Sequence, residues 1–169
     1  LVTFYKAALA AGIKPIVGAD VALRLHDDGR PPGRLLLLCR DATGYANLAR
    51  HLSRAYLEGQ ENGQPVIRAA WLGGGGAAGL IAVSPGPDGI LGAALAAGRM
   101  EQAAQALAQC RQLFNGDFYL GVQRTGRSPE EQYLDHAVRL AVAAGCPLVA
   151  TNDVRFLRPA DFEAHEARV

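Results

Sequence analysis

The sequence predicts an α/β fold in which buried strands alternate with amphipathic helices. Apolar runs of strand length recur between longer segments that carry apolar residues every three or four positions. The 169 residues are 50% hydrophobic and 20% charged, which is the composition of a folded globular domain. The 20 glycines and 9 prolines supply turns between short elements. Together these observations favour a mostly parallel sheet or an α/β barrel.

The first part of the chain is predicted to contain two helices and two strands. Residues 1–11 have helical composition and stop at Gly12, and residues 14–23 are typical of a strand followed by an extended stretch. After a turn-rich loop, residues 35–39 are apolar throughout, which predicts a strand buried on both faces. An amphipathic helix follows and ends near Gly59. Its apolar stripe consists of Tyr45, Leu48, Ala49, Leu52 and Tyr56.

The middle of the chain is predicted to contain a glycine loop, one strand and two helices. The four glycines at 73–76 are not followed by the Gly-Lys-Ser/Thr of a phosphate-binding loop, so we interpret residues 71–76 as a flexible connection. Residues 80–84 are typical of a buried strand. Asp88 is the expected N-cap of a helix that reaches about Ala97. A second helix is predicted over residues 100–114.

The last part of the chain repeats the alternation of strand and helix. Residues 117–124 predict a strand, and Ser128 is the expected N-cap of a helix, with Pro129 first in it and Glu131 completing a capping box. The side chains expected to point inward from this helix are Tyr133, Leu134, Ala137, Val138 and Ala141. Residues 147–151 predict the last strand, and Pro159 opens the last helix.

Charge and cysteine content restrict the function classes. A net charge of +1 argues against nucleic-acid binding through a strongly basic surface as the main function. No apolar run approaches the roughly 18–20 residues of a membrane span, and we expect no membrane contact. Cys39, Cys110 and Cys146 are widely spaced within apolar runs, so we interpret them as buried thiols of a cytoplasmic protein.

Residue chemistry predicts where a site lies but not which reaction it performs. In α/β folds, ligands gather at the carboxyl ends of the strands. The polar residues expected just past predicted strands are Asp20, Ser84, Arg124 and Asn152-Asp153. The four histidines form no metal-ligand pair, and the sequence has no nucleophile elbow and no dinucleotide fingerprint.

Several motifs occur in a specific order along essentially the whole chain. They are FYK at 4–6, GIKPIVG at 12–18, TGYANL at 43–48, SRAY at 53–56, QRTGR at 123–127, ATNDVRF at 150–156 and DFEAHE at 161–166. Together they resemble the PHP (polymerase and histidinol phosphatase) domain of bacterial DNA polymerase III alpha subunits. The resemblance implies a distorted (β/α) barrel. The family's first strands and its polymerase core would lie outside this sequence, so we expect residues 1–169 to be a partial PHP domain that is incomplete at its N-terminal end.

The resemblance also implies a degenerate metal site. Active family members hold divalent metals with His, Asp, Glu and Cys side chains, and the metals activate water for phosphodiester hydrolysis. Asp20 stands where a Glu ligand is usual, and Asp153 matches an Asp ligand. The positions with substituted ligands are Arg34 for His, Gly86 for Cys, Thr125 for His and Arg155 for His. Arginine offers no lone pair, so we expect Arg155 to pair with Asp153 or Asp20 in place of metal charge, or else to be solvated.

The resemblance further implies a role within a replicative DNA-directed DNA polymerase, a nucleotidyltransferase that uses Mg²⁺ and contacts DNA elsewhere in its chain. This segment is then an inactive scaffold that stabilises the polymerase and docks the proofreading exonuclease subunit. No cofactor is expected in it, and Zn²⁺ or Mn²⁺ only if its own site works. Two alternatives stay open: an active metal-dependent phosphoesterase or 3'-5' exonuclease, and an enzyme binding a small phosphorylated ligand through Arg124, Arg127 and Arg155.

Overall fold

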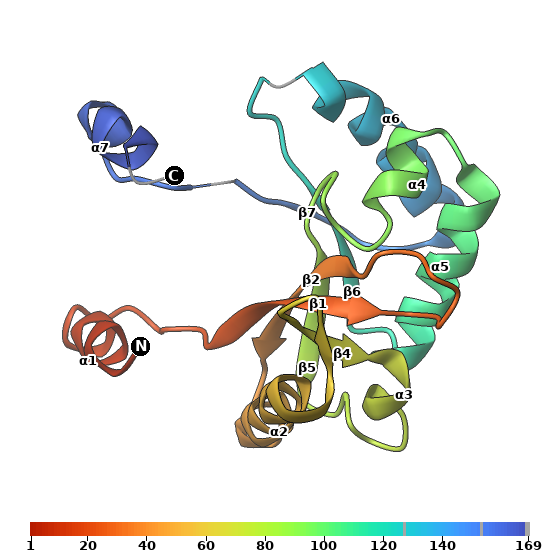
Figure 1. The fold of residues 1–169 in the computed structure, drawn as a ribbon. Helices are drawn as coiled ribbons and strands as arrows, with labels where there is room; N and C mark the ends of the chain where they lie inside the picture. Colours follow the sequence, from red (N-terminus) through yellow and green to blue (C-terminus); the bar gives the residue numbers. More distant parts are fainter. Residues whose placement is uncertain (127, 153, 168–169) are drawn as a thin grey trace.

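The computed structural model describes residues 1–126, 128–152 and 154–167, and it has the expected α/β architecture (Figure 1). The elements in chain order are α1 (Val2–Ala10), β1 (Gly18–Arg24), β2 (Gly33–Cys39), α2 (Ala42–Glu58), β3 (Gln60–Glu61), β4 (Gln64–Arg68), α3 (Ala69–Leu72), β5 (Leu80–Ser84), α4 (Gly92–Ala96), α5 (Met100–Leu113), β6 (Phe118–Val122), α6 (Ser128–Ala144), β7 (Leu148–Ala150), the 3₁₀ helix η1 (Pro159–Asp161) and α7 (Phe162–Glu166). Most predicted elements are present, and the short strands β3 and β4 are additions that the sequence did not indicate.

Within the described ranges, the strands form one mixed sheet in the order β3-β4-β1-β2-β5-β6-β7. Strands β1, β4, β5, β6 and β7 run in one direction, whereas β2 runs against both of its neighbours and β3 runs against β4. The prediction of a mostly parallel sheet therefore holds for the larger part of it. The described sheet does not close into a barrel, so it corresponds to a partial barrel.

One face of the sheet carries the hydrophobic core. Strand β2 shows this most clearly, because Leu35 and Leu37 are fully buried while Leu36 and Leu38 are only half-buried. Helices α4, α5 and α6 gather beside the sheet, and they contribute Leu95, Leu107 and Tyr133 to the same core (Figure 1). The prediction that this strand is buried on both faces is therefore wrong, and the opposite face of the sheet stays partly open.

Helix α2 presents to the core a face that matches the predicted one only in part, since Leu48 is buried and Leu52 packs against the core as expected. Its buried residues are Gly44, Asn47, Leu48, His51 and Ala55. Tyr45 and Tyr56, expected to point inward, are 55% and 63% exposed. Two polar side chains take the inward positions because they find backbone acceptors. The Nδ2 of Asn47 donates to the Ala78 carbonyl at 2.9 Å, and the Nε2 of His51 lies 2.8 Å from the Gly76 carbonyl oxygen.

Two further details of the helices differ from the sequence prediction. Helix α4 begins at Gly92 with Leu91 at its N-cap, so Asp88 does not cap it. On α6, Val138 is partly exposed and Leu140 is buried instead, although Tyr133, Ala137 and Ala141 point inward as expected. The predicted cap at Ser128 depends on a side chain outside those described.

The first and last helices stand apart from the sheet on the same side of the molecule (Figure 1). Neither α1 nor α7 buries any residue. Helix α1 nevertheless carries Phe4, Tyr5 and Leu9 on its exposed surface. Among the described residues, no helix has the length and apolar character that crossing a membrane requires.

Candidate metal site

Asp20 and Arg34 lie on the partly open face of the sheet. The register pairs Asp20 with Leu36 and Ala22 with Arg34, so Asp20 and Arg34 are diagonal neighbours on one face. Ala22 is small, which leaves room for the Arg34 side chain to cross toward Asp20. The Nε of Arg34 lies 3.4 Å from Oδ1 of Asp20, and its Nη2 forms an ion pair with Oδ2. Asp20 therefore lies within β1 and not past its end, contrary to the prediction.

Asp88 brings a second carboxylate to Arg34. Its Oδ2 is 3.6 Å from Nη1 of Arg34. The backbone holds the two segments together, since the Arg34 N–H donates to the Asp88 carbonyl at 3.3 Å and the Ile90 N–H donates to the Arg34 carbonyl at 3.0 Å. A Cβ on Gly33 would lie 2.4 Å from Cα of Ile90, so only glycine allows this approach. We call these three charged side chains the Asp20–Arg34–Asp88 cluster.

Gly86 and Thr125, two further positions where the family resemblance predicts replaced ligands, both have structural roles. Gly86 is buried with φ +42°, a left-handed conformation, and a Cβ there would lie 3.1 Å from Cδ of Gln123. Thr125 donates two hydrogen bonds to Glu130, from its N–H to Oε2 and from its Oγ1 to Oε1, each 2.6 Å long. Gly86 has no side chain that could ligate a cation, and the Thr125 hydroxyl is used to hold the Glu130 carboxylate.

Glu130 is a buried carboxylate that the sequence analysis missed. It is 3% exposed and lies in the first turn of α6, where the helix dipole favours negative charge. Besides the two bonds from Thr125, it faces the Nε2 of Gln123 at 3.3 Å. The capping-box pattern drew attention to the next residue, Glu131, whose exposed side chain pairs with Arg124 at 2.8 Å.

The remaining predicted site residues are not brought together as ligands. Asp153 lies outside the described residues, so its expected pairing with Arg155 stays a prediction. Arg155 is exposed on the segment after β7. Ser84 ends β5 and is fully buried, and its Oγ has no hydrogen-bond partner among the described residues. The cation that contacts Asp20 on this face is Arg34, which comes from the neighbouring strand β2.

The described residues do not fit a metal ion. No group of three or more His, Cys, Asp or Glu side chains within residues 1–126, 128–152 and 154–167 is arranged to hold one. In the Asp20–Arg34–Asp88 cluster the two carboxylates share one guanidinium. A guanidinium has five N–H donors and no lone pair, so it satisfies the carboxylates and cannot ligate a metal.

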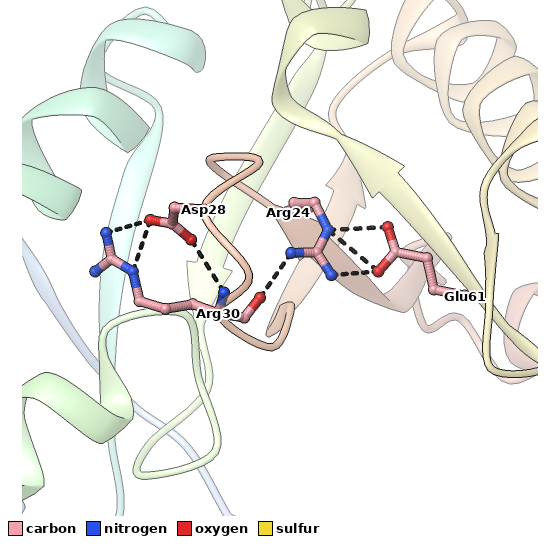
Figure 2. A network of polar contacts seen from close by, with 4 residues as sticks. All are labelled: Arg24, Asp28, Arg30 and Glu61. Carbon is pink, nitrogen blue, oxygen red and sulfur yellow. Dashed lines mark hydrogen bonds and ion pairs between the residues drawn. The ribbon is translucent and has the colours of Figure 1, made fainter.

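A second polar network fixes the loop that leads from β1 to β2. Figure 2 shows Arg24 forming a two-pronged ion pair with Glu61 of β3 and donating from Nη1 to the Arg30 carbonyl at 2.6 Å. Arg30 in turn pairs with Asp28. The hydrogen bond from Arg24 lowers the pKa of Glu61, and that from Arg30 lowers the pKa of Asp28. This network holds the loop that immediately precedes Arg34.

The cysteines show no sign of a reactive thiol. Cys110 and Cys146 are buried in the core as predicted, and Cys39 is half-buried at the end of β2. Burial raises the pKa of Cys110 to about 12, and burial also raises the pKa values of Cys146 and Cys39. A raised pKa disfavours the thiolate, which is the nucleophilic and metal-binding form.

Comparison with known proteins shows which sequences this chain resembles. Residues 1–125 match the PHP domain. The chain is 47% identical over 169 residues to DNA polymerase III subunit alpha of Pseudomonas aeruginosa. It is 44% identical to the subunit of the same name from Pseudomonas fluorescens and 43% identical to that of Escherichia coli strain K12. Each alignment covers 100% of this chain and 14% of the relative, so the chain spans about one-seventh of their length.

Proposed function

Because this chain belongs to the PHP domain family, we propose that it forms the PHP segment of a DNA polymerase III alpha subunit and acts there as a scaffold without hydrolytic activity. The larger protein would carry out DNA-directed DNA synthesis in replication with Mg²⁺ at a site elsewhere in its chain. The identity of the chain to DNA polymerase III subunit alpha of several bacteria supports this assignment.

The observation that carries the scaffold role is the pairing of Asp20 with Arg34. Metal-dependent hydrolysis needs a divalent ion that lowers the pKa of a bound water and balances phosphate charge. Here a ligand-type carboxylate forms an ion pair with a guanidinium, Gly86 offers no side chain in place of Cys, and Thr125, in place of His, donates its hydroxyl hydrogen to Glu130. These substitutions favour a site that contributes structure over one that contributes catalysis.

We also propose that this segment docks the proofreading exonuclease subunit. The family resemblance motivates it, and the exposed apolar side chains of α1 and α2 are compatible with a surface that contacts other polypeptide. The alternative of a small phosphorylated ligand receives no support from Arg124, because its guanidinium is engaged by Glu131.

The test uses the intact protein that carries this segment. Purified protein is incubated with a labelled single-stranded oligonucleotide and Mn²⁺ or Zn²⁺, alone and with the purified exonuclease subunit. We expect primer extension with Mg²⁺, stable co-elution with the exonuclease subunit, and no oligonucleotide cleavage by the protein alone. Cleavage that disappears in Asp20→Asn but persists in the matched Asp28→Asn would establish the phosphoesterase alternative instead.

A further inference from the structure

We propose that Arg34 is the resident cation of this site: its guanidinium holds the carboxylates of Asp20 and Asp88 together and excludes divalent ions from them. This inference rests on the proposed function and deepens it, because it names the residue that replaces the metal. It also differs from the expectation drawn from the sequence, which gave that role to Arg155.

The Asp20–Arg34–Asp88 cluster has the charges expected if an arginine replaced a metal ion between two carboxylates. Two carboxylates from separate segments, one within β1 and one in the loop after β5, converge on one planar cation from β2. A guanidinium can donate from different nitrogens to two acceptors at once, whereas lysine is a single point charge. Arg34 donates hydrogen bonds to Asp20 from Nε and Nη2, and its Nη1 forms a longer ion pair with Asp88 at 3.6 Å.

The backbone fixes the position of the guanidinium. The bonds between Arg34 and the segment of Asp88 and Ile90 bring that loop against the start of β2, and the β1–β2 register fixes Asp20 two residues along the neighbouring strand. The Arg24–Glu61 pair holds the preceding loop (Figure 2). The side chains of Arg34 and Asp20 are 43% and 44% exposed, so a cation from solution could reach these carboxylates if the guanidinium did not already hold them.

A divalent ion would have to displace Arg34 or sit beside it. A divalent ion beside Arg34 would bring two positive charges within contact distance, and they would repel each other even in water. Removing the guanidinium reverses the situation, since Asp20 and Asp88 then both lose the cation that they share. Either the guanidinium or a divalent ion can then neutralise the two carboxylates. We therefore expect a variant without the guanidinium to lose stability and a divalent ion to restore part of that stability.

The experiment compares four forms of the intact protein by thermal unfolding and Mn²⁺ titration. They are the wild type, Arg34→Gln, the double variant Arg34→Gln with Asp20→Asn, and the matched control Arg30→Gln, which removes a nearby exposed arginine from the loop that precedes β2. Sites elsewhere in the protein contribute equally to all four forms. We expect Mn²⁺ to bind Arg34→Gln at one additional site, at least tenfold more tightly than it binds that region of the wild type.

Arg34→Gln should also have a lower Tm than the Arg30→Gln control, and Mn²⁺ should raise it. Adding Asp20→Asn should recover part of the lost Tm and remove the Mn²⁺ effect. The inference is overturned if Mn²⁺ stabilises the wild type in a manner that Asp20→Asn abolishes, if Arg34→Gln unfolds at the same Tm as the control, or if Mn²⁺ affects the two variants equally. Oligonucleotide cleavage by the wild type would refute the proposed function separately, since these binding and stability differences are measured without any substrate.

Discussion

At the scale of single residues, neighbouring carboxylates on α6 have opposite environments. Glu130 is buried and accepts hydrogen bonds from Thr125, while Glu131 is exposed and pairs with Arg124. Hydrogen bonds to a buried charged acceptor contribute more than an exposed ion pair does. Position 130 therefore matters more to folding than the capping position 131 that the sequence pattern singled out.

Replacing these two glutamates by alanine tests the difference directly. We expect Glu130→Ala to lower the free energy of unfolding by about 2 kcal/mol, because the donors of Thr125 lose a charged acceptor. Glu131→Ala is the matched control and should change it by less than about 1 kcal/mol. Urea denaturation of both variants measures the two values. Equal losses would mean that the buried hydrogen bonds contribute no more than the surface pair.

The Arg24–Glu61 pair gives a prediction about pH. The hydrogen bond from Arg24 lowers the pKa of Glu61 from its ordinary value of 4.5, so the pair stabilises the fold fully above that value. Its contribution is lost as the pH falls through the lowered pKa, because protonation then removes the charge. We expect Glu61→Gln to lower the Tm by about 2 °C near neutral pH.

Thermal unfolding of wild type and Glu61→Gln across the acid range provides the measurement. The Tm difference should shrink steadily once the pH is below 4.5. Arg24→Met, which removes the other partner, should follow the same pH course. A difference that stays constant into strong acid would contradict the assignment of the pair as the source of stability.

At the scale of elements, the sequence predicted best those segments whose local pattern and packing agree. Strand β5 was predicted with its observed boundaries, and α5 differs by one residue at its end. The inward face of α2 was predicted only in part. Leu48 and Leu52 pack inward as expected, but Asn47 and His51 are also buried, through hydrogen bonds to the turn at Gly76 and Ala78 about thirty residues further along the chain. A helical periodicity of apolar residues carries no information about such distant acceptors.

Close packing between α2 and the start of β5 supplies a prediction at this scale. A Cβ on Gly44 would lie 1.9 Å from the carbonyl oxygen of Gly79, the residue before β5, so the helix and this turn approach at a distance that only glycine permits. Gly44→Ala should lower the free energy of unfolding by about 3 kcal/mol even though alanine is the better helix former.

The exposed position Ala46 on the same helix is the control. Ala46→Gly should lower the free energy of unfolding by about 1 kcal/mol through helix propensity alone. Glycine is therefore expected to be the more stable residue at position 44 and alanine at position 46 of the same helix. Circular dichroism during urea unfolding measures both variants. A stabilised Gly44→Ala protein would show that α2 can move away from the sheet without loss.

At the scale of the whole molecule, the sequence named residues of the proposed site but could not give their arrangement in space. Asp20 and Arg34 were both identified as ligand positions from the family resemblance, yet their pairing depends on the β1–β2 register. Asp88 was expected to cap a helix, and its contact with Arg34 depends on how the loop after β5 folds back over β2. Contacts between segments that are distant in sequence are set by topology, which local patterns do not contain.

The distribution of charge over the molecule leads to the last prediction. The net charge is +1, and in the described residues many arginines already have a carboxylate partner; these are Arg24, Arg30, Arg34, Arg40, Arg54, Arg124 and Arg139. A DNA phosphate would have to displace those carboxylates. We therefore expect Arg124→Gln combined with Arg139→Gln to leave the affinity of the intact protein for primed DNA, and its salt dependence, unchanged.

Fluorescence anisotropy at several salt concentrations tests this expectation. Each lost phosphate contact would reduce the slope of log K against log salt by about 0.9 in magnitude. The complementary variant, Glu131→Gln with Asp135→Asn, frees the same two arginines and should also leave the slope unchanged, because in the proposed function the larger protein contacts DNA elsewhere in its chain. If the face touched DNA, the two variants would shift the slope in opposite directions, and the paired arginines would then be part of a nucleic-acid surface whose carboxylates regulate it.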